Sequence, residues 1–389
     1  QGLQKTGFGV YVNDGKYQEI VYFYKDRIRL FYANVYVPIN TSTSRDYAIA
    51  GKDSSIYIYQ KLYDQSTASY NLVVSGPGLF VTPSTIAANS RNPDVSIDST
   101  GIHHVVWNDD GNGRSRILHS YFDDQSWSVP ESVTESWQFS MKNPSITIDS
   151  KDRIWVAYED TSWGQSEISV SVKDANGWNP KIRITNAKSN KGRPDIAVDT
   201  NDNVHLVWED DRDGHYKIFW AQWDNTTQSW NSSGQYGDDD PIMQFSSSDA
   251  YQVDEVVEFK NPSISLLYPY MFVVCEGHYA LSQVSAIYKG FRDLVDNFWN
   301  TSGAVIKDVD GSFAAYGMPS IVSDPSRNAF NPAIASSVSA NQILRTWEDR
   351  TEPVSQIYGA SFHALGSVRS DAQQITSYTS DCKNPSNSA

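Results

Sequence analysis

Charged and amide side chains recur at one fixed place in this 389-residue chain, next to short strand-like runs. Five segments open on a dipeptide in front of a proline, and four of these dipeptides hold a cation. The five dipeptides are Arg91-Asn92, Lys142-Asn143, Gly192-Arg193, Lys260-Asn261 and Phe330-Asn331. Guanidinium and ammonium groups beside amides can hold a carboxylate or a sugar. The chemistry that this pattern predicts is therefore recognition of an anion or a glycan.

Carboxylates stand at the far end of each segment, after its second strand-like run. They occur in Asn108-Asp109-Asp110, Glu159-Asp160, Glu209-Asp210-Asp211-Arg212-Asp213, Glu276 with His278, and Glu348-Asp349-Arg350. Nearby Trp163, His215 and Tyr279 could offer flat apolar surfaces to a sugar. The predicted ligand-binding residues are Arg91, Asn92, Asp109, Asp110, Lys142, Asn143, Glu159, Asp160, Arg193, Glu209, Asp210, Arg212, Lys260, Asn261, Glu276, His278, Asn331, Glu348 and Asp349.

A structural alternative explains the same residues. Each cation could pair with an acid of the adjacent loop and brace the fold. A supporting role should recur from copy to copy, whereas a catalytic role should not. Recurrence therefore favours bracing over chemistry.

No catalytic or metal-binding motif accompanies these residues. The chain holds no CxxC, HExxH, GxSxG or phosphate loop, and its seven histidines fall at unmatched places. We therefore predict no metal and no cofactor. Calcium is the alternative at the acidic stretches 210–213, 238–240 and 308–311, although none has the layout of an EF-hand.

The segments that carry these residues are copies of one repeat. The copies opening at Asn92, Asn143 and Arg193 each count fourteen residues from proline to the residue that closes the second run, as from Pro93 to Trp107. The copies at Asn261 and Asn331 count twelve and fifteen. From the closing residue to the first apolar residue of the third run, all five copies count ten. Such regular spacing indicates a repeat architecture.

Each copy predicts four short antiparallel strands. Alternating apolar residues form two runs joined by a polar turn, an acidic loop leads to a third run, and a further turn leads to a fourth. The aspartates Asp98, Asp149 and Asp199 are expected to hold the first turn, and Asp123, Asp174 and Asp224 the third, by accepting backbone hydrogen bonds. The tryptophans of the copies are expected to pack between sheets.

Four antiparallel strands per copy predict an all-β fold, a β-propeller of four-stranded antiparallel blades. Seven blades are expected, with six as the alternative. A single domain over 1–378 would hold blades near 1–45, 46–91, 92–142, 143–192, 193–260, 261–330 and 331–378, followed by a flexible tail, 379–389. The run 373–377 is a candidate to complete a blade begun at the N-terminus.

The charge and composition of the chain limit the kinds of binding partner that we expect. A net charge of −15 disfavours nucleic acid and anionic membranes, and no apolar run is long enough to span a bilayer. A chain that opens on Gln1 and carries sequons at Asn40, Asn225, Asn231 and Asn300 is expected to be a secreted or surface-displayed glycoprotein. Its two cysteines, Cys275 and Cys382, predict one disulfide, with a buried Cys275 and an unrelated Cys382 as the alternative.

The repeats resemble the Asp-box, or bacterial neuraminidase repeat (BNR), propellers of the sialidase-like superfamily. In that family a turn S-x-D-x-G-x-x-W joins strands three and four, and Asp174-Ala175-Asn176-Gly177-Trp178 looks like a contracted version. The family's N-terminal F/Y-R-I-P signature has its nearest counterpart in Asp26-Arg27-Ile28-Arg29, without the proline. The resemblance implies a propeller and leaves its function open, since such folds carry hydrolases, lyases, lectins and adhesion modules.

Three functions remain in view. The first is a binding module that recognises a glycan or a surface protein through the face carrying the repeated charges. The second is a sialidase-like glycoside hydrolase or a polysaccharide lyase acting on an anionic sugar, with two carboxylates as acid and base. The third is a self-assembling subunit of an extracellular filament or virion. The lack of a catalytic motif favours binding over enzyme activity.

Overall fold

The computed structural model describes residues 9–13, 18–24, 27–28, 47–52, 55–64, 69–76, 79–80, 90–110, 114–123, 126–134, 139–212, 214–231, 256–267, 269–279, 285–293, 320–321, 323, 326–337, 342–363, 373–375 and 386–388. These residues form two compact units. Unit 1 comprises 1–34, 207–220 and 239–389, and unit 2 comprises 35–206 and 221–238. The single domain expected from the sequence stays a prediction.

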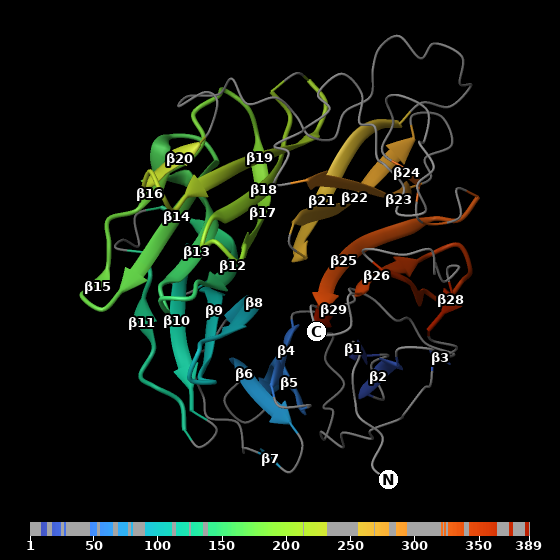
Figure 1. The fold of residues 1–389 in the computed structure, drawn as a ribbon, viewed down its shortest axis with the longest axis horizontal. Coiled ribbons are helices and arrows are strands. Elements are labelled where there is room, and N and C mark those ends of the chain that lie inside the picture. The colour runs from blue at the N-terminus through green and yellow to red at the C-terminus, as the bar shows by residue number, and fades with distance from the viewer. Residues whose placement is uncertain are drawn as a thin grey trace. The chain divides into compact units, whose positions relative to one another are not determined.

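Unit 2 contains three complete antiparallel sheets, drawn from blue to green in Figure 1. The first sheet holds β4 (Tyr47–Lys52), β5 (Ser55–Asp64), β6 (Ser69–Gly76) and β7 (Leu79–Phe80). The second holds β8 (Ser90–Ile97), β9 (His103–Asp109), β10 (Arg116–Phe122) and β11 (Glu131–Ser132). The third holds β12 (Met141–Ile148), β13 (Ile154–Asp160), β14 (Glu167–Asp174), β15 (Gly177–Trp178) and β16 (Ile182–Arg183).

Unit 1 also contains three complete sheets. One holds β21 (Val256–Leu267), β22 (Tyr270–Tyr279), β23 (Ser285–Asp293) and β24 (Ser320–Ile321). The next holds β25 (Ala329–Ser337), β26 (Gln342–Asp349), β27 (Gln356–His363) and β28 (Gln373–Gln374). The last combines β1 (Gly9–Asn13), β2 (Gln18–Tyr24) and β3 (Arg27–Ile28) with β29 (Ser386–Ser388).

One further sheet has residues in both units. It follows the order β17 (Lys191–Val198), β18 (Val204–Asp210), β19 (Lys217–Asp224) and β20 (Ser229–Asn231). All pairings within the sheets are antiparallel wherever the register is defined, as between β13 and β14, where Ile154 faces Lys173 and Asp160 faces Glu167. The described residues thus build seven sheets. The predicted four strands are present in each repeat copy, and the copy that opens at Asn143 adds a fifth strand, β16, which pairs with β14.

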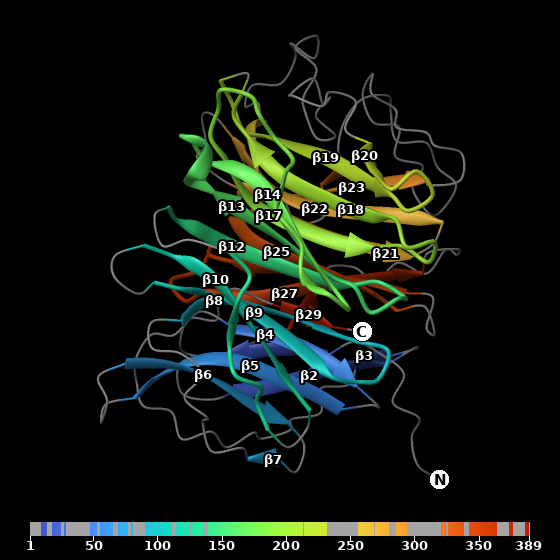
Figure 2. The ribbon, with the colours of Figure 1, turned by 90° about the vertical axis from the view of Figure 1, so that its left-hand side faces the viewer.

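The first strands of consecutive sheets lie against one another within each unit. In unit 2, β4 contacts β8, β8 contacts β12, and β12 contacts β17; in unit 1, β21 contacts β25. Figure 2 shows β8, β12 and β17 following one another from bottom to top. Where side chains are described, neighbouring sheets of a unit bury apolar residues against each other, as blades do, because a single four-stranded sheet cannot cover its own apolar faces.

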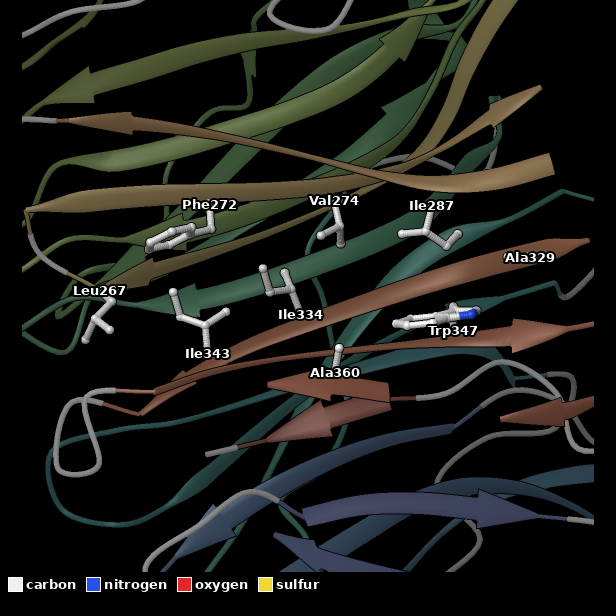
Figure 3. Close-up of a cluster of buried hydrophobic side chains, with 9 residues drawn as sticks. All are labelled: Leu267, Phe272, Val274, Ile287, Ala329, Ile334, Ile343, Trp347 and Ala360. Carbon is white, nitrogen blue, oxygen red and sulfur yellow. The ribbon is translucent and has the colours of Figure 1, made fainter. Parts of the chain in front are cut away.

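Apolar side chains fill the space between stacked sheets. In unit 1, one cluster joins β21–β23 to β25–β27, and it consists of Leu267, Phe272, Val274, Ile287, Ala329, Ile334, Ile343, Trp347 and Ala360 (Figure 3). In unit 2, Val106, Ile117 and Met141 belong to a cluster between the second and third sheets. Trp107, Trp208 and Trp347 are almost fully buried, which confirms the expected packing role of the repeated tryptophan.

The C-terminal segment differs from its prediction. Gln373–Gln374 pairs with β27, so the run 373–377 does not complete the N-terminal blade. That place is taken by Ser386–Ser388, which pairs with β1 through Gly9↔Ser388 and Tyr11↔Ser386. These three residues belong to the segment that was expected to be a flexible tail. A strand edge presents unpaired N–H and C=O groups, and β29 satisfies them on β1.

Candidate functional site

The residue before each repeated proline adopts a left-handed backbone conformation. The φ angles are 47° for Asn92, 50° for Asn143, 49° for Arg193, 51° for Asn261 and 49° for Asn331. The pairing of first and second strands shifts register beside each asparagine, as between Lys142 and Ser145. Asparagine tolerates this conformation better than most residues, which explains its use at four of the five places.

In three sheets, a glutamate near the end of the second strand binds the asparagine of its own sheet. The Asn143 side-chain amide donates to Glu159 at 2.6 Å, and the Asn331 amide donates to Glu348 at 2.8 Å. The Asn261 amide makes the same bond with Glu276. The bond fixes the bulge that the left-handed residue creates.

The same acid also binds the backbone of the next sheet. The Arg193 backbone N–H donates to Glu159 at 2.9 Å, and that of Asn331 donates to Glu276 at 2.6 Å. The corresponding backbone bonds run from Asn261 to Glu209 at 2.8 Å and from Asn143 to the Asn108 side chain at 3.1 Å. We call Asn108, Glu159, Glu209 and Glu276 the clip residues, because each joins two successive sheets.

The clip residues show what the repeated charge pattern does in the structure. Their oxygens accept hydrogen bonds from groups that a bulge would otherwise leave without partners. The clip residues thus brace successive sheets, but through asparagine amides and backbone N–H groups and not through the cation–acid pairs of the bracing alternative. A role of these residues in binding a ligand remains a prediction.

Most other predicted site residues form local ion pairs. These pairs are Arg91 with Asp110 at 2.7 Å, Asp109 with Arg116 at 2.9 Å, Asp160 with Lys181 at 2.7 Å, Asp210 with Arg212 at 2.5 Å, Lys260 with Glu258 at 2.5 Å, Glu348 with Arg350 at 2.5 Å and Asp349 with Arg327 at 2.6 Å. His278 lies between Glu276 and Ser285, at 3.1 and 2.7 Å. In addition, the side chains of Asn92 and Asn143 bond to each other.

Lys142 is an exception among these residues. Its side chain is exposed, and it makes no ion pair or hydrogen bond with any residue that the structure describes. Arg91 is also well exposed, at 58 %, but it holds Asp110. Lys142 therefore offers a charge that the fold itself does not use.

The opposite end of each sheet carries the predicted aspartate turns. Asp149 accepts hydrogen bonds from the backbone N–H groups of Lys151 and Arg153, each at 3.0 Å. Asp98 and Asp199 accept the equivalent bonds in their copies. Asp123, Asp174 and Asp224 hold the third turn in the same way. Both predicted turn roles are confirmed.

Three loops at the clip end of the β12–β16 sheet lie side by side. The Thr161 N–H donates to the Ser140 carbonyl at 3.1 Å, and the Gln165 amide donates to the Ala187 carbonyl at 2.6 Å. The Ser166 hydroxyl bonds to the Lys191 carbonyl at 3.0 Å. We call residues 139–142, 161–166 and 187–191 the loop surface.

Trp163 is the most prominent side chain of the loop surface. It ends the short 3-10 turn η2 (Thr161–Trp163), where Gly164 with a φ of 89° turns the chain back. Its ring is 40 % exposed, while its indole N–H donates to the Ser169 hydroxyl at 3.2 Å. Lys181 and Arg183 lie 5.2 and 4.9 Å from the ring centroid. The ring is thus fixed in place and partly open to solvent.

Two buried carboxylates hold the cations around Trp163. Asp160 binds Lys181, while Glu167 binds Arg183 at 2.9 Å and the buried Lys191 at 3.2 Å. Burial acts to raise the pKa of Asp160, but hydrogen bonds from Lys181 and Ser162 outweigh it and lower that pKa. Three cations around two carboxylates leave this cluster with a net positive charge.

The sequence around this cluster is locally basic in an acidic protein. Residues 175–194 contain five cations and no acid, although the whole chain has 31 Lys and Arg against 46 Asp and Glu. Lys188 is exposed and, in the part of the chain that the structure describes, has no partner. Sequence reasoning noticed Trp163 and Lys142 but missed this run, which a windowed charge count would have found.

A second group was missed entirely. Asp94, Ser145 and Asp195 each follow the repeated proline, on β8, β12 and β17. The Ser145 hydroxyl donates to Asp195 at 2.8 Å, and the Ile146 N–H donates to Asp94 at 2.8 Å. Burial and then the charge of Asp195 raise the pKa of Asp94 to about 7. A carboxyl that keeps its proton near neutral pH beside a carboxylate is suited to acid–base chemistry.

The structure also bears on the predicted disulfide and on possible metal sites. Cys275 is a free, fully buried thiol in β22, so the predicted disulfide with Cys382 is corrected, and Cys382 lies outside the described residues. Burial raises the pKa of the Cys275 thiol well above its ordinary value. Among the residues with described side chains, no group of three or more ligands could hold a metal.

The sequons are only partly visible. The Asn225 amide donates to the Asn201 carbonyl at 3.2 Å and accepts from Arg153 at 3.1 Å. Asn231 ends β20 and its side chain is not described, while Asn40 and Asn300 lie outside the described residues. No described helix is long and apolar enough to cross a membrane.

Comparison with known proteins supports a fold for this chain but assigns it to no family. No family model matches the chain, and no curated protein matches it. A protein of unknown function from Dyadobacter fermentans is 10 % identical with a TM-score of 0.50, over 92 % of this chain and 98 % of the other. A polysaccharide lyase of family PL25, an ulvan lyase bound to -[GlcA(1-4)Rha3S]-, is 10 % identical with a TM-score of 0.50, over 73 % of this chain and 71 % of the other.

An α-L-arabinanase from Penicillium chrysogenum in complex with arabinobiose is also similar, at 10 % identity and a TM-score of 0.49, over 88 % and 89 % of the two chains. Together with the repeated antiparallel sheets, the likeness to the PL25 lyase and to the Dyadobacter fermentans protein defines the class: the chain is an all-β protein with a β-propeller fold. The likeness supports the propeller fold without the narrower Asp-box superfamily. Seven blades remain a prediction.

Proposed function

We propose that this protein is a carbohydrate-active β-propeller that binds an acidic polysaccharide through the loop surface. The observation that carries the proposal is the fixed, 40 % exposed ring of Trp163 within a locally basic surface of an acidic chain. Sugar rings present C–H faces that pack on aromatic rings, and sulfate or carboxylate groups bind Lys and Arg. The two features together fit a sugar that is also an anion.

The unpartnered cations are placed to reach such a ligand. Lys142 and Lys188 lie on the loop surface and are exposed, whereas Lys181 and Arg183 are held by buried acids. Phe139, at 38 % exposure, adds a second open aromatic ring to the same surface. A chain of sugar units could therefore contact an aromatic ring and a cation at successive positions.

One further observation supports this class of ligand. The ulvan lyase with the same fold was solved with a glycan that contains glucuronic acid, named GlcA in the structure's description. A separate observation bears on the fold and not on the ligand: the Asp174 carboxylate accepts a backbone hydrogen bond from Asn176 at 2.7 Å and an amide hydrogen bond from Asn179 at 3.1 Å, which fits an Asp-box turn. We include an Asp-box relationship and an extracellular, glycosylated state in the proposal. Recognition of a surface protein and self-assembly are alternatives.

Binding to polymers of known charge tests the proposal. The purified protein would be run in affinity gels and titrated calorimetrically with polyglucuronate, a sulfated galactan and neutral arabinan. We expect the acidic polymers to bind, binding to weaken with added salt, and Trp163→Ala to lower the affinity about tenfold. Preference for the neutral polymer, or full affinity in Trp163→Ala, would refute it. Lys151→Ala, at the opposite end of the same sheet, is the matched control.

A second candidate function is cleavage of the bound polysaccharide. It is favoured by Asp94, whose raised pKa suits a general acid, beside Asp195 and Ser145. We expect Asp94→Asn to abolish the release of shortened or unsaturated sugars while leaving polymer binding intact. Product release by Asp94→Asn at the wild-type rate would rule out this acid, and no release by the wild-type protein would leave binding as the function.

A further inference from the structure

A chain of four ionisable side chains crosses the β8–β11 sheet of unit 2. The Asp98 carboxylate lies 3.1 Å from His104 Nε2, and His104 Nδ1 lies 3.0 Å from His119 Nε2. His119 Nδ1 lies 2.8 Å from Glu131 Oε1. The two imidazole rings are stacked, with an interplanar angle of 8°. No function proposed above uses these residues.

The contacts among these four side chains determine how many N–H groups the two histidine rings must carry. Ionised carboxylates only accept hydrogen bonds, so the Asp98 and Glu131 contacts each require an N–H on a ring, and the contact between the rings requires one more. Three N–H groups on two rings correspond to one imidazolium and one neutral imidazole. Two neutral rings leave one contact without a hydrogen, whereas two imidazoliums place N–H against N–H at 3.0 Å.

The surroundings of the pair also limit its charge. His119 is buried, and the exposed fraction of the His104 side chain is only 12 %. Lys173 of β14 binds the same Glu131 oxygen as His119, and therefore adds a positive charge from the neighbouring sheet. On the remaining sides, Tyr121 and Trp178 pack on the rings, and Asp152 approaches through its bonds to Ser99.

We infer that His104 and His119 form a single-proton switch that takes up one proton, and only one, while the protein is folded. The first proton completes the three contacts, and the second would break the contact between the rings. The same proton competes with Lys173 for Glu131, so uptake weakens a link between the β8–β11 and β12–β16 sheets. The pair thus couples acidification to a contact between two blades.

The directions of the pKa shifts set the pH window. Burial is the largest influence on both rings, and it lowers the pKa of His104 and of His119 below the ordinary 6.5 despite their carboxylate partners. The His119 hydrogen bond lowers the pKa of Glu131 to about 2, so this carboxylate stays ionised through the window. Since the unfolded chain binds more protons here than the folded one, the pair's contribution to stability falls as the pH drops below about 6.5.

Imidazole NMR signals recorded from about pH 8 to about pH 4 test the switch. We expect the two rings to titrate together, with a total uptake of one proton and a midpoint below that of a free histidine. In His104→Gln, His119 should instead titrate as a single group, and tryptophan fluorescence would verify that the variant is folded. Uptake of two protons by the folded wild-type pair, or an unchanged His119 titration in His104→Gln, would overturn the inference.

A charge variant gives an independent measurement without touching either ring. Lys173→Met removes the nearest cation, so the shared midpoint should rise by a measurable fraction of a pH unit. Lys188→Met removes an exposed lysine of the loop surface and should leave the midpoint unchanged. Equal midpoints in the wild type and Lys173→Met would contradict the proposed competition for Glu131.

Discussion

The clip residues and the loop surface stand at the same end of the sheets, yet they differ in one respect. Glu159, Glu209 and Glu276 each accept a backbone N–H of the next sheet, inside unit 1 and inside unit 2, and Glu159 and Glu276 also accept an asparagine amide of their own sheet. The loop surface carries Trp163, and the neighbours of this ring, Lys181 and Arg183, belong to a five-cation run, residues 175–194, that no other copy has. The comparison teaches that the repeated acids support this fold, while the charges proposed to act on a ligand include lysines, Lys142 and Lys188, that no described acid holds.

Removing a clip residue should give the largest effect. Glu276 is buried and accepts bonds from the Asn261 amide, the Asn331 backbone and His278. We expect Glu276→Ala to lower the free energy of unfolding by about 3 kcal/mol, because buried donors lose their acceptor. Urea unfolding measures this, with the exposed Glu352→Ala as the control. If Glu276→Ala lost no more stability than Glu352→Ala, residues that recur from copy to copy could not be assumed to stabilise the fold.

Removing a repeated turn aspartate should cost somewhat less. The Asp149 side chain is fully buried and accepts bonds from Lys151, Arg153 and the Trp155 indole at 3.0 Å. For Asp149→Ala we expect a loss of about 2 kcal/mol in thermal or urea unfolding, with polysaccharide binding unchanged. If binding fell while stability held, the division between supporting and ligand-facing residues would fail.

Trp163→Ala should show the opposite behaviour. Its ring is 40 % exposed and its main contacts are two cations that buried acids also hold. The unfolding free energy should change by less than about 1 kcal/mol, while polymer affinity falls about tenfold as proposed above. A stability loss comparable to that of Glu276→Ala would assign the ring to the fold.

The smallest expected effect belongs to a single surface charge. Lys188→Ala should weaken acidic polymer binding about threefold at low salt, and the difference should vanish at high salt. Lys151, which is 55 % exposed near Asp202 at the other end of the sheet, provides the comparison. Equal losses in Lys188→Ala and Lys151→Ala would show only a general charge effect.

Much of the fold was readable from local patterns. The period of two along each run, the constant ten-residue step and the turn aspartates are all features of neighbouring residues. They predicted antiparallel four-strand sheets and the acceptors of the turns, and the structure confirms both. The closing strand was missed because 373–377 and 386–388 are both short, and only pairing partners distinguish them.

By itself, the sequence determined the repeated blade, since strand period and turn chemistry act over a few residues. The tertiary structure decided which charges are occupied, because this depends on how far one sheet's side chains reach into the next. Glu159 meets the Arg193 backbone across sheets, and Asp94 meets the Ile146 backbone likewise. Lys142 finds no such acceptor among the described residues, although its sequence position matches that of Arg91. The stacking of the sheets thus gives residues at equivalent sequence positions different partners.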